Sequence, residues 1–150
     1  MAYVIPHETT TIVTRTYSHS GPSYQAYLIL RVGFAALPII VGIDKFTDLL
    51  TDWDKYLSGT FAGISPLNVH STMMGIGVIE VLAGLFVALR PRIGAYIVAA
   101  WLVGIIVNLL LLPGYFDVAL RDFGLCLGAI ALGRLSQEYD GVAGIEETIV

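Results

Sequence analysis

Charged side chains stand inside apolar segments of this sequence, and they are its first candidates for chemistry. Glu80 lies within the run VIEVLAGLFVAL at residues 78–89. A lone Asp, Lys or Arg at the centre of a membrane helix costs roughly 2.5–3.5 kcal/mol on insertion scales, so such a group is expected to have a partner. The candidate ligand-binding or charge-network residues are Arg31, Lys45, Glu80, Asn108, Arg121 and Asp122.

A network of these groups has two interpretations. It can be structural and fix the register and orientation of neighbouring helices through buried ion pairs. It can instead form a site for a polar ligand such as a quinone headgroup or a proton, because intramembrane ionisable residues often mark functional sites. The residue types alone leave both interpretations open.

Residue counts along the apolar segments give the expected depths of these groups. At the helical rise, measured from the face assumed to be cytoplasmic, Arg31 lies at ~8 Å and Glu80 at ~14 Å. Arg121 and Asp122 lie near ~20 Å, and Asn108 near ~22 Å. Arg31 and Glu80 differ by ~6 Å in height, within reach of an arginine side chain. We therefore predict that arginines of the first and fourth segments neutralise Glu80, with Asn108 as a neutral member.

Arg121 has an alternative partner. Asp117 precedes it by four residues, and an acid on the N-terminal side is the better order for a helical ion pair. Arg121 can therefore pair with Asp117, or it can turn inward to Glu80 and leave Asp117 to Lys45.

Other kinds of site are poorly supported. The three histidines are far apart, and no His/Glu pair has helical spacing, so no metal site is predicted. The single cysteine, Cys126, excludes an internal disulfide and a cysteine-based zinc site. No nucleophile–base pair or nucleotide-binding loop is visible, and no covalently bound cofactor is expected. The net charge of −4 is scattered, so nucleic acid is not an expected partner.

The elements that must position these residues are membrane helices. Apolar residues make up 56% of the chain and charged residues 13%, about half the charged fraction of soluble domains. Apolar stretches at residues 26–43, 71–89, 93–112 and 116–135 have roughly the 20-residue length that a span requires. The sequence therefore predicts an all-α fold, a four-transmembrane-helix antiparallel bundle in a lipid bilayer.

Short connections support the antiparallel order. RPR at 90–92 and PGY at 113–115 each leave room only for a tight turn. The longer link carries FTDLLTDWDKYLSGTF at 46–61, whose apolar residues recur every three to four positions. We predict a short amphipathic interfacial helix there, with Trp53 and Tyr56 as anchors, and a solvated loop is the alternative. Ser65 is the expected N-cap of the second span.

The remaining predictions concern organisation and topology. Residues 1–24 are predicted to form a polar N-terminal arm without the features of a secretory signal, residues 25–135 the transmembrane domain, and residues 136–150 a polar C-terminal tail. Two small-residue pairs, Gly124 with Gly128 and Ala100 with Gly104, are expected to allow close helix packing. The basic residues favour cytoplasmic termini in the cell membrane, since Arg15, Arg90, Arg92 and Arg134 oppose Lys45 and Lys55.

Three segments resemble DoxX-like membrane proteins. They are LILRVGFAALPIIVGIDKFTD, GVIEVLAGLFVAL and RDFGLCLGAIALGRL, within residues 27–135. The resemblance implies a four-helix membrane bundle, in a family whose members accompany quinone-linked oxidation of sulfur compounds, terminal oxidases or soluble redox enzymes. The longer N-terminal arm and the acidic linker depart from the family pattern and look like docking surfaces. The matching positions are Arg31, Gly42, Lys45, Glu80, Gly84 and Asp122.

The functional expectation follows from the charges and the resemblance together. We expect a small multi-pass membrane subunit of a quinone-linked respiratory or electron-transfer oxidoreductase complex, with a quinone as its ligand and other membrane subunits as partners. An accessory or quinone-site subunit is favoured over a stand-alone enzyme. The alternative is a non-catalytic scaffold or assembly subunit. A small-solute transporter is weaker, because no pair of discontinuous helices is visible.

Overall fold

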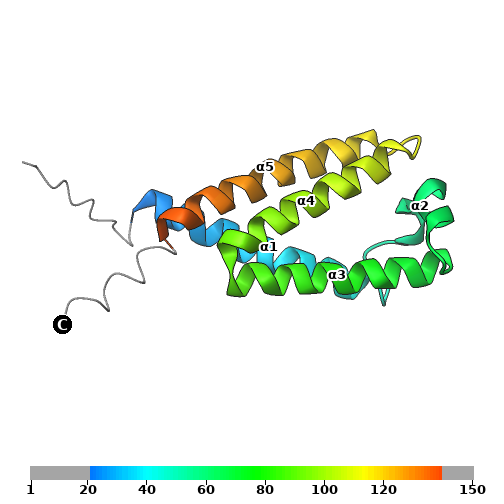
Figure 1. Cartoon of the computed structure of the whole chain (residues 1–150), viewed down its shortest axis with the longest axis horizontal. Coiled ribbons are helices and arrows are strands. Elements are labelled where there is room, and N and C mark those ends of the chain that lie inside the picture. The colour runs from blue at the N-terminus through cyan, green and yellow to red at the C-terminus, as the bar shows by residue number, and fades with distance from the viewer. Residues whose placement is uncertain (1–20, 140–150) are drawn as a thin grey trace, which may run out of the picture.

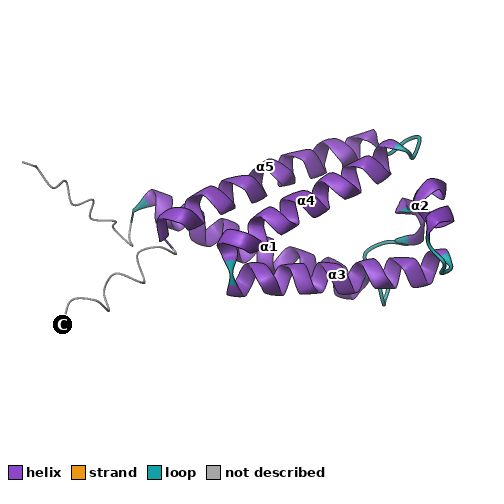
Figure 2. Ribbon diagram, viewed as in Figure 1, coloured by secondary structure: helices purple, strands orange, loops and turns teal. Residues whose placement is uncertain are grey.

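The computed structural model describes residues 21–139, and every regular element in that range is a helix. Figures 1 and 2 show the order of the elements along the chain. The all-helical prediction is confirmed for this range. The long helices are α1 (Pro22–Asp44), α3 (Val69–Leu89), α4 (Pro91–Leu110) and α5 (Phe116–Tyr139), and the short ones are η1 (Asp54–Tyr56) and α2 (Gly59–Ile64).

The long helices pack in two pairs, α1 with α3 and α4 with α5. Helices that follow one another through a tight turn run antiparallel, as the short links at 90 and 111–115 require. Helix α3 also contacts α4, and α1 contacts α5. The two ends of the described chain therefore lie at one end of the molecule, and α2 lies at the other (Figure 1).

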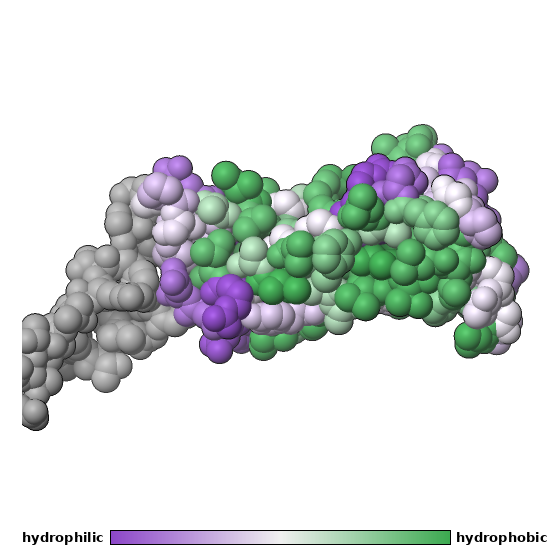
Figure 3. Space-filling view, turned by 90° about the horizontal axis from the view of Figure 1, so that it is seen from above, coloured by the Kyte–Doolittle hydropathy of each residue, from purple (hydrophilic) through white to green (hydrophobic). Residues whose placement is uncertain are grey.

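Three of the long helices are long and apolar enough to cross a membrane. Their mean hydropathies are 2.1 for α1, 2.1 for α3 and 2.3 for α4. Their outward side chains are large and apolar, as Ile29 and Leu82 illustrate with exposed fractions of 72% and 60%. The face seen in Figure 3 is dominated by apolar residues, with more polar ones toward its ends. A lipid bilayer is the environment that such a surface fits.

Helices α1 and α3 approach closely at facing glycines. A Cβ atom built on Gly42 would lie 2.5 Å from the backbone oxygen of Gly77, and one on Gly77 would lie 2.5 Å from the oxygen of Gly42. One end of the pair is thereby pinned backbone to backbone. Gly84 repeats the arrangement farther along, where a Cβ would lie 2.6 Å from the oxygen of Ala35. Small residues allow such contacts between membrane helices.

The small-residue pairs singled out in the sequence do not make these contacts. Gly104 and Gly124 have no atom within 4 Å of the position that a Cβ would take. Gly128 faces only the ring of Phe34. A Cβ on Gly128 would lie 3.1 Å from that ring, so close packing is present at Gly128 and absent at Gly104 and Gly124 within this chain. Residue spacing does not reveal which face of a helix meets a neighbour.

The first and last long helices extend beyond the predicted domain boundaries. Residues 22–24 form the first turn of α1, and residues 136–139 form the last turn of α5. The hydroxyls of Ser23 and Tyr139 share a hydrogen bond of 2.6 Å, and the ring of Tyr139 packs on Tyr24 and Tyr27. This contact holds the two helix ends together. The rest of the predicted arm and tail lies outside the described residues.

The predicted amphipathic helix at 46–61 does not form as one element. The chain instead makes turns, then η1, then α2, which ends at Ile64. Asp48 has a φ of 49°, in the left-handed region that interrupts a helix. The backbone N–H groups of Leu49 and Leu50 bond to the carboxylate of Asp44 instead of to carbonyls one turn earlier. This local alternative outcompetes the helix that the apolar periodicity indicates.

The start of α3 also differs from the prediction. Its N-cap is Asn68, whose side chain accepts a hydrogen bond of 2.7 Å from the N–H of Ser71. Ser65, the predicted cap, accepts from the N–H of Leu67 and bonds to the hydroxyl of Thr72. Asparagine is at least as good a cap as serine, so the helix begins three residues later than predicted.

Candidate functional site

The centre of the candidate site is a buried ion pair between α1 and α3. The Nζ atom of Lys45 lies 2.6 Å from Oε2 of Glu80, and their side chains are only 4% and 9% exposed. Lys45 follows the last residue of α1, while Glu80 lies in the middle of α3. The close approach at Gly77 makes the pair possible, since the Cβ of Lys45 lies 3.1 Å from the place of a Cβ there.

A cavity of about 510 Å³ adjoins this pair. It lies among all four long helices and residues 53–61, and its walls are mainly aliphatic and aromatic, including Phe34, Leu37, Met73 and Leu102. This volume is in the range of small-molecule sites, which combine apolar walls with a few polar groups. The lining residues whose side chains carry polar or charged groups are Lys45, Trp53, Tyr56, Glu80, Trp101, Asn108, Arg121 and Asp122.

Trp101 and Asp122 bring polar atoms to the same cavity from α4 and α5. The indole Nε1 of Trp101 is buried and has no hydrogen-bond partner. The indole interacts with Glu80, although Nε1 falls short of hydrogen-bond geometry with any atom. Asp122 is half-buried, and its charge interacts with those of Arg121 and Glu80. The carboxylates of Glu80 and Asp122 therefore both belong to residues that line the cavity, and Lys45 pairs with only the first of them.

Arg31 does not pair with Glu80, and this prediction is wrong. Its guanidinium donates to the backbone oxygen of Ala88 at 2.7 Å and to the hydroxyl of Tyr27 at 3.2 Å. The last carbonyls of a helix have no partner within it, and a cation favours that end. The end of α3 therefore attracts Arg31 away from the cavity, which it does not line.

Arg121 takes the first of its two alternative partners. Its guanidinium lies 3.6 Å from the carboxylate of Asp117, and the two side chains are 71% and 75% exposed. The second alternative, in which Arg121 turns to Glu80 and Asp117 is left to Lys45, does not occur. The prediction that an arginine of the fourth segment neutralises Glu80 is therefore wrong, because Lys45 holds that carboxylate. Arg121 still borders the cavity on the α5 side.

Asn108 has a different task from the one predicted. Its amide nitrogen donates to the oxygen of Tyr56 at 2.6 Å, and its amide oxygen accepts from the N–H of Ser58 at 2.9 Å. Asn108 thus fastens the segment between α1 and α3 onto α4. It lines the cavity without joining the ion pair.

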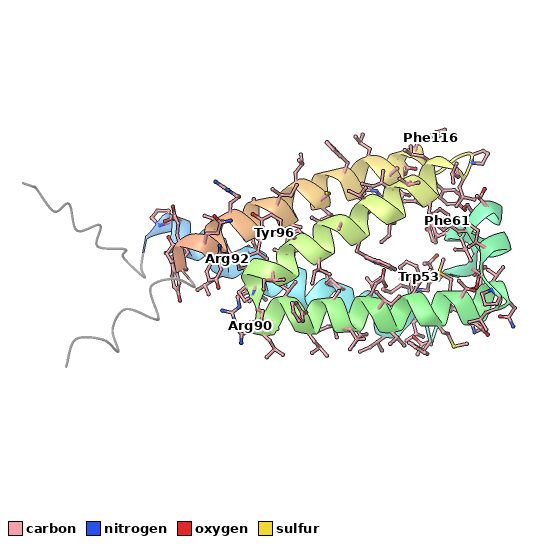
Figure 4. The ribbon with its side chains drawn as sticks, in the orientation of Figure 1. Trp53, Phe61, Arg90, Arg92, Tyr96 and Phe116 are labelled. Atoms are coloured by element: carbon pink, nitrogen blue, oxygen red, sulfur yellow. The ribbon has the colours of Figure 1, made fainter. Side chains whose placement is uncertain are left out.

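Asp44 and Trp53 complete the site and were missed as site residues by sequence reasoning. The carboxylate of Asp44 accepts from Nε1 of Trp53 at 2.7 Å. The indole of Trp53 then covers Lys45, whose Nζ lies 3.9 Å from the ring centroid. Figure 4 shows Trp53 between α3 and α4, toward the end of the molecule where α2 lies. The usable signal was an aspartate at the end of an apolar run, followed by a tryptophan within ten residues.

Comparison with protein-family models, with curated proteins and with solved structures found no match. The resemblance to DoxX-like proteins therefore remains a prediction that rests on the three quoted segments. Of its six matching positions, Gly42, Lys45, Glu80 and Gly84 take part in the α1–α3 contact or in its ion pair. Asp122 lines the cavity, and only Arg31 lies away from both.

Proposed function

We propose that this chain is a DoxX-like membrane subunit of a quinone-linked electron-transfer complex and that its cavity binds the quinone ring. The observation that carries the proposal is the buried Lys45–Glu80 pair at a mainly apolar cavity of about 510 Å³. In this proposal, neighbouring membrane subunits supply the electron donor. The chain is an accessory subunit that holds the quinone.

The lining of the cavity matches the two parts of a quinone. Aliphatic and aromatic side chains such as Phe34 and Leu102 offer surfaces for a flat ring and an isoprenoid tail. The ion pair presents one positive and one negative group whose charges sum to zero. Such a pair suits an uncharged polar headgroup better than an ion. Asp122 is placed to exchange a proton with a hydroxyl of the reduced ring.

The proposal includes α5 as a fourth transmembrane helix. Its 24 residues are long enough to span, and it has the most extensive contact of any helix pair, with α4. Its charged residues lie near its two ends and leave residues 123–133 without charge, and near its start Asp117 pairs with Arg121. Four spans place both termini on one side, together with Arg90, Arg92 and Arg134, and the distribution of basic residues makes that side the cytoplasm of a cell membrane.

Cysteine labelling in sealed vesicles tests this topology. In a Cys126→Ser background, we expect Arg92→Cys and Gln137→Cys to react with an impermeant maleimide from one side, and Asp52→Cys from the other. Arg92 and Gln137 lie at opposite ends of the α4–α5 pair in sequence but at one end of the molecule in space. Labelling of Gln137→Cys from the same side as Asp52→Cys would show that α5 does not cross.

Quinone binding is tested with the two tryptophans, which both line the cavity. Titrating the purified full-length protein in detergent with decylubiquinone should quench its tryptophan fluorescence saturably. Gly104 lines the cavity and has open space at its Cβ position, so Gly104→Leu should fill part of the cavity and weaken binding about tenfold, or by about 1.4 kcal/mol. Gly33→Leu is the matched control, since Gly33 also has open space but lies outside the cavity lining.

Equal quenching curves for both variants would place the quinone elsewhere and overturn the proposal. A folded protein without saturable quenching would leave the scaffold function as the better one. The exposed Gly124, which does not line the cavity, fits that function, since it offers a neighbouring chain a close approach.

A further inference from the structure

We infer that Trp101 is the hydrogen-bond donor that recognises an acceptor oxygen, such as a ring carbonyl, on the ligand in this cavity. The inference rests on the proposed function and adds to it the residue that selects the ligand. It concerns one atom, the buried Nε1 of Trp101.

Each of the other cavity-lining side chains that carries an N–H donor already has a partner, and for Trp53 this partner is Asp44. Lys45 donates to Glu80 at 2.6 Å and lies against the ring of Trp53. The amide of Asn108 donates to a backbone oxygen, and Arg121 pairs with Asp117. Trp101 alone among these brings a buried N–H that has no partner. A ligand oxygen can therefore gain a hydrogen bond at Trp101 without breaking one.

The chemistry of the indole determines which kind of ligand group can bind to its N–H. An indole N–H donates and never accepts, so its partner must carry a lone pair. A buried polar group without a partner is costly, and this cost is removed when a ligand oxygen fills the position. A hydrocarbon of the same shape would leave the cost in place. Discrimination between ligands with and without an oxygen thus follows from Trp101 itself.

Glu80 is the competing partner for this N–H. Its carboxylate interacts with the indole, but Lys45 already occupies Oε2. A small rotation of the indole onto the carboxylate would satisfy Nε1 within the protein and leave nothing for a ligand. The state of this N–H before any ligand is added therefore decides between the two arrangements.

Nitrogen-15 NMR of the indole group provides the test. The chain has two tryptophans, so Trp53→Phe leaves Trp101 as the single indole signal of the full-length protein in micelles. Decylubiquinone should move this signal saturably in the direction of a new hydrogen bond, and decylbenzene should not. In the complementary variant, Trp101→Phe, quenching of Trp53 by decylubiquinone should require about fivefold more quinone, the effect of one hydrogen bond.

The outcomes separate the inference from the proposed function. A shift with the ketone 2-undecanone but not with decylubiquinone would support Trp101 as the donor and overturn the quinone. Saturable quinone quenching with an unmoved indole signal, and with unchanged affinity in Trp101→Phe, would overturn the inference and leave the function standing. An indole signal already at a hydrogen-bonded position before any addition would overturn the inference. If no probe changed the indole signal or the tryptophan fluorescence, both the inference and the proposed function would be overturned.

Discussion

Replacing Lys45 by methionine destabilises the protein by about 3–5 kcal/mol, the loss expected when one partner of a buried ion pair is removed. Glu80 would then hold an uncompensated charge at a side chain that is only 9% exposed. The double variant Lys45→Met/Glu80→Met removes both charges and keeps most of the volume. It should recover most of the loss, because no ion remains to be buried.

The measurement is equilibrium unfolding of the full-length protein in mixed micelles of increasing SDS content, followed by circular dichroism. The four proteins of a double-mutant cycle give the coupling between the two residues. Lys55→Met is the matched control, since Lys55 is exposed and has no part in the pair. Additive losses in the cycle would contradict the pair as the structure shows it.

The double variant also separates the two interpretations of the charges. A stable double variant that still binds decylubiquinone would make the pair a device that fixes α1 against α3. A stable double variant that no longer binds it would make the pair part of the ligand site. The contact between α1 and α3 does not depend on the ion pair alone in either case, because Gly42 and Gly77 also bring the two backbones together.

The sequence predicted the helices well and their ends less well. Length and hydropathy located α1, α3 and α4, since a run of about 20 apolar residues has few alternatives to a helix. The segment after α1 was mispredicted because periodicity reports on a regular helix and not on a carboxylate that binds nearby N–H groups. Asp44 was visible in the sequence, but the direction of its side chain was not.

The candidate site was predictable in its central residue but not in its pairing. Glu80 stood out as a carboxylate in an apolar run, and Lys45 was among the candidates. Counting heights favoured Arg31 over Lys45, because it ignored the free carbonyls at the end of α3 that compete for the guanidinium. The cavity itself was beyond sequence reasoning, since it depends on how the pair α1–α3 stands against the pair α4–α5.

Asp44→Ala should release the segment between α1 and η1. The carboxylate of Asp44 accepts hydrogen bonds from the backbone N–H groups of Leu49 and Leu50 and from the indole of Trp53. Hydrogen bonds to a charged group are worth about 1.5–3 kcal/mol each, so losing them should lower the local opening free energy by about 3 kcal/mol. Amide exchange at Leu49 and Leu50 should then be about 100-fold faster.

Hydrogen–deuterium exchange of the full-length protein measures this effect, with the amides of α4 as an internal reference. Asp52→Ala is the matched control, because Asp52 is an exposed aspartate of the same segment. Its carboxylate accepts a hydrogen bond from the N–H of Asp54 and does not bond to Leu49, Leu50 or Trp53. Asp44→Asn should fall between the wild type and Asp44→Ala, since the amide keeps one oxygen acceptor but loses the charge. Unchanged exchange at Leu49 in Asp44→Ala would mean that other contacts hold the segment. Faster exchange there, together with greater solvent exposure of the Trp53 indole, would identify Asp44 as the residue that keeps this side chain over Lys45 in the cavity wall.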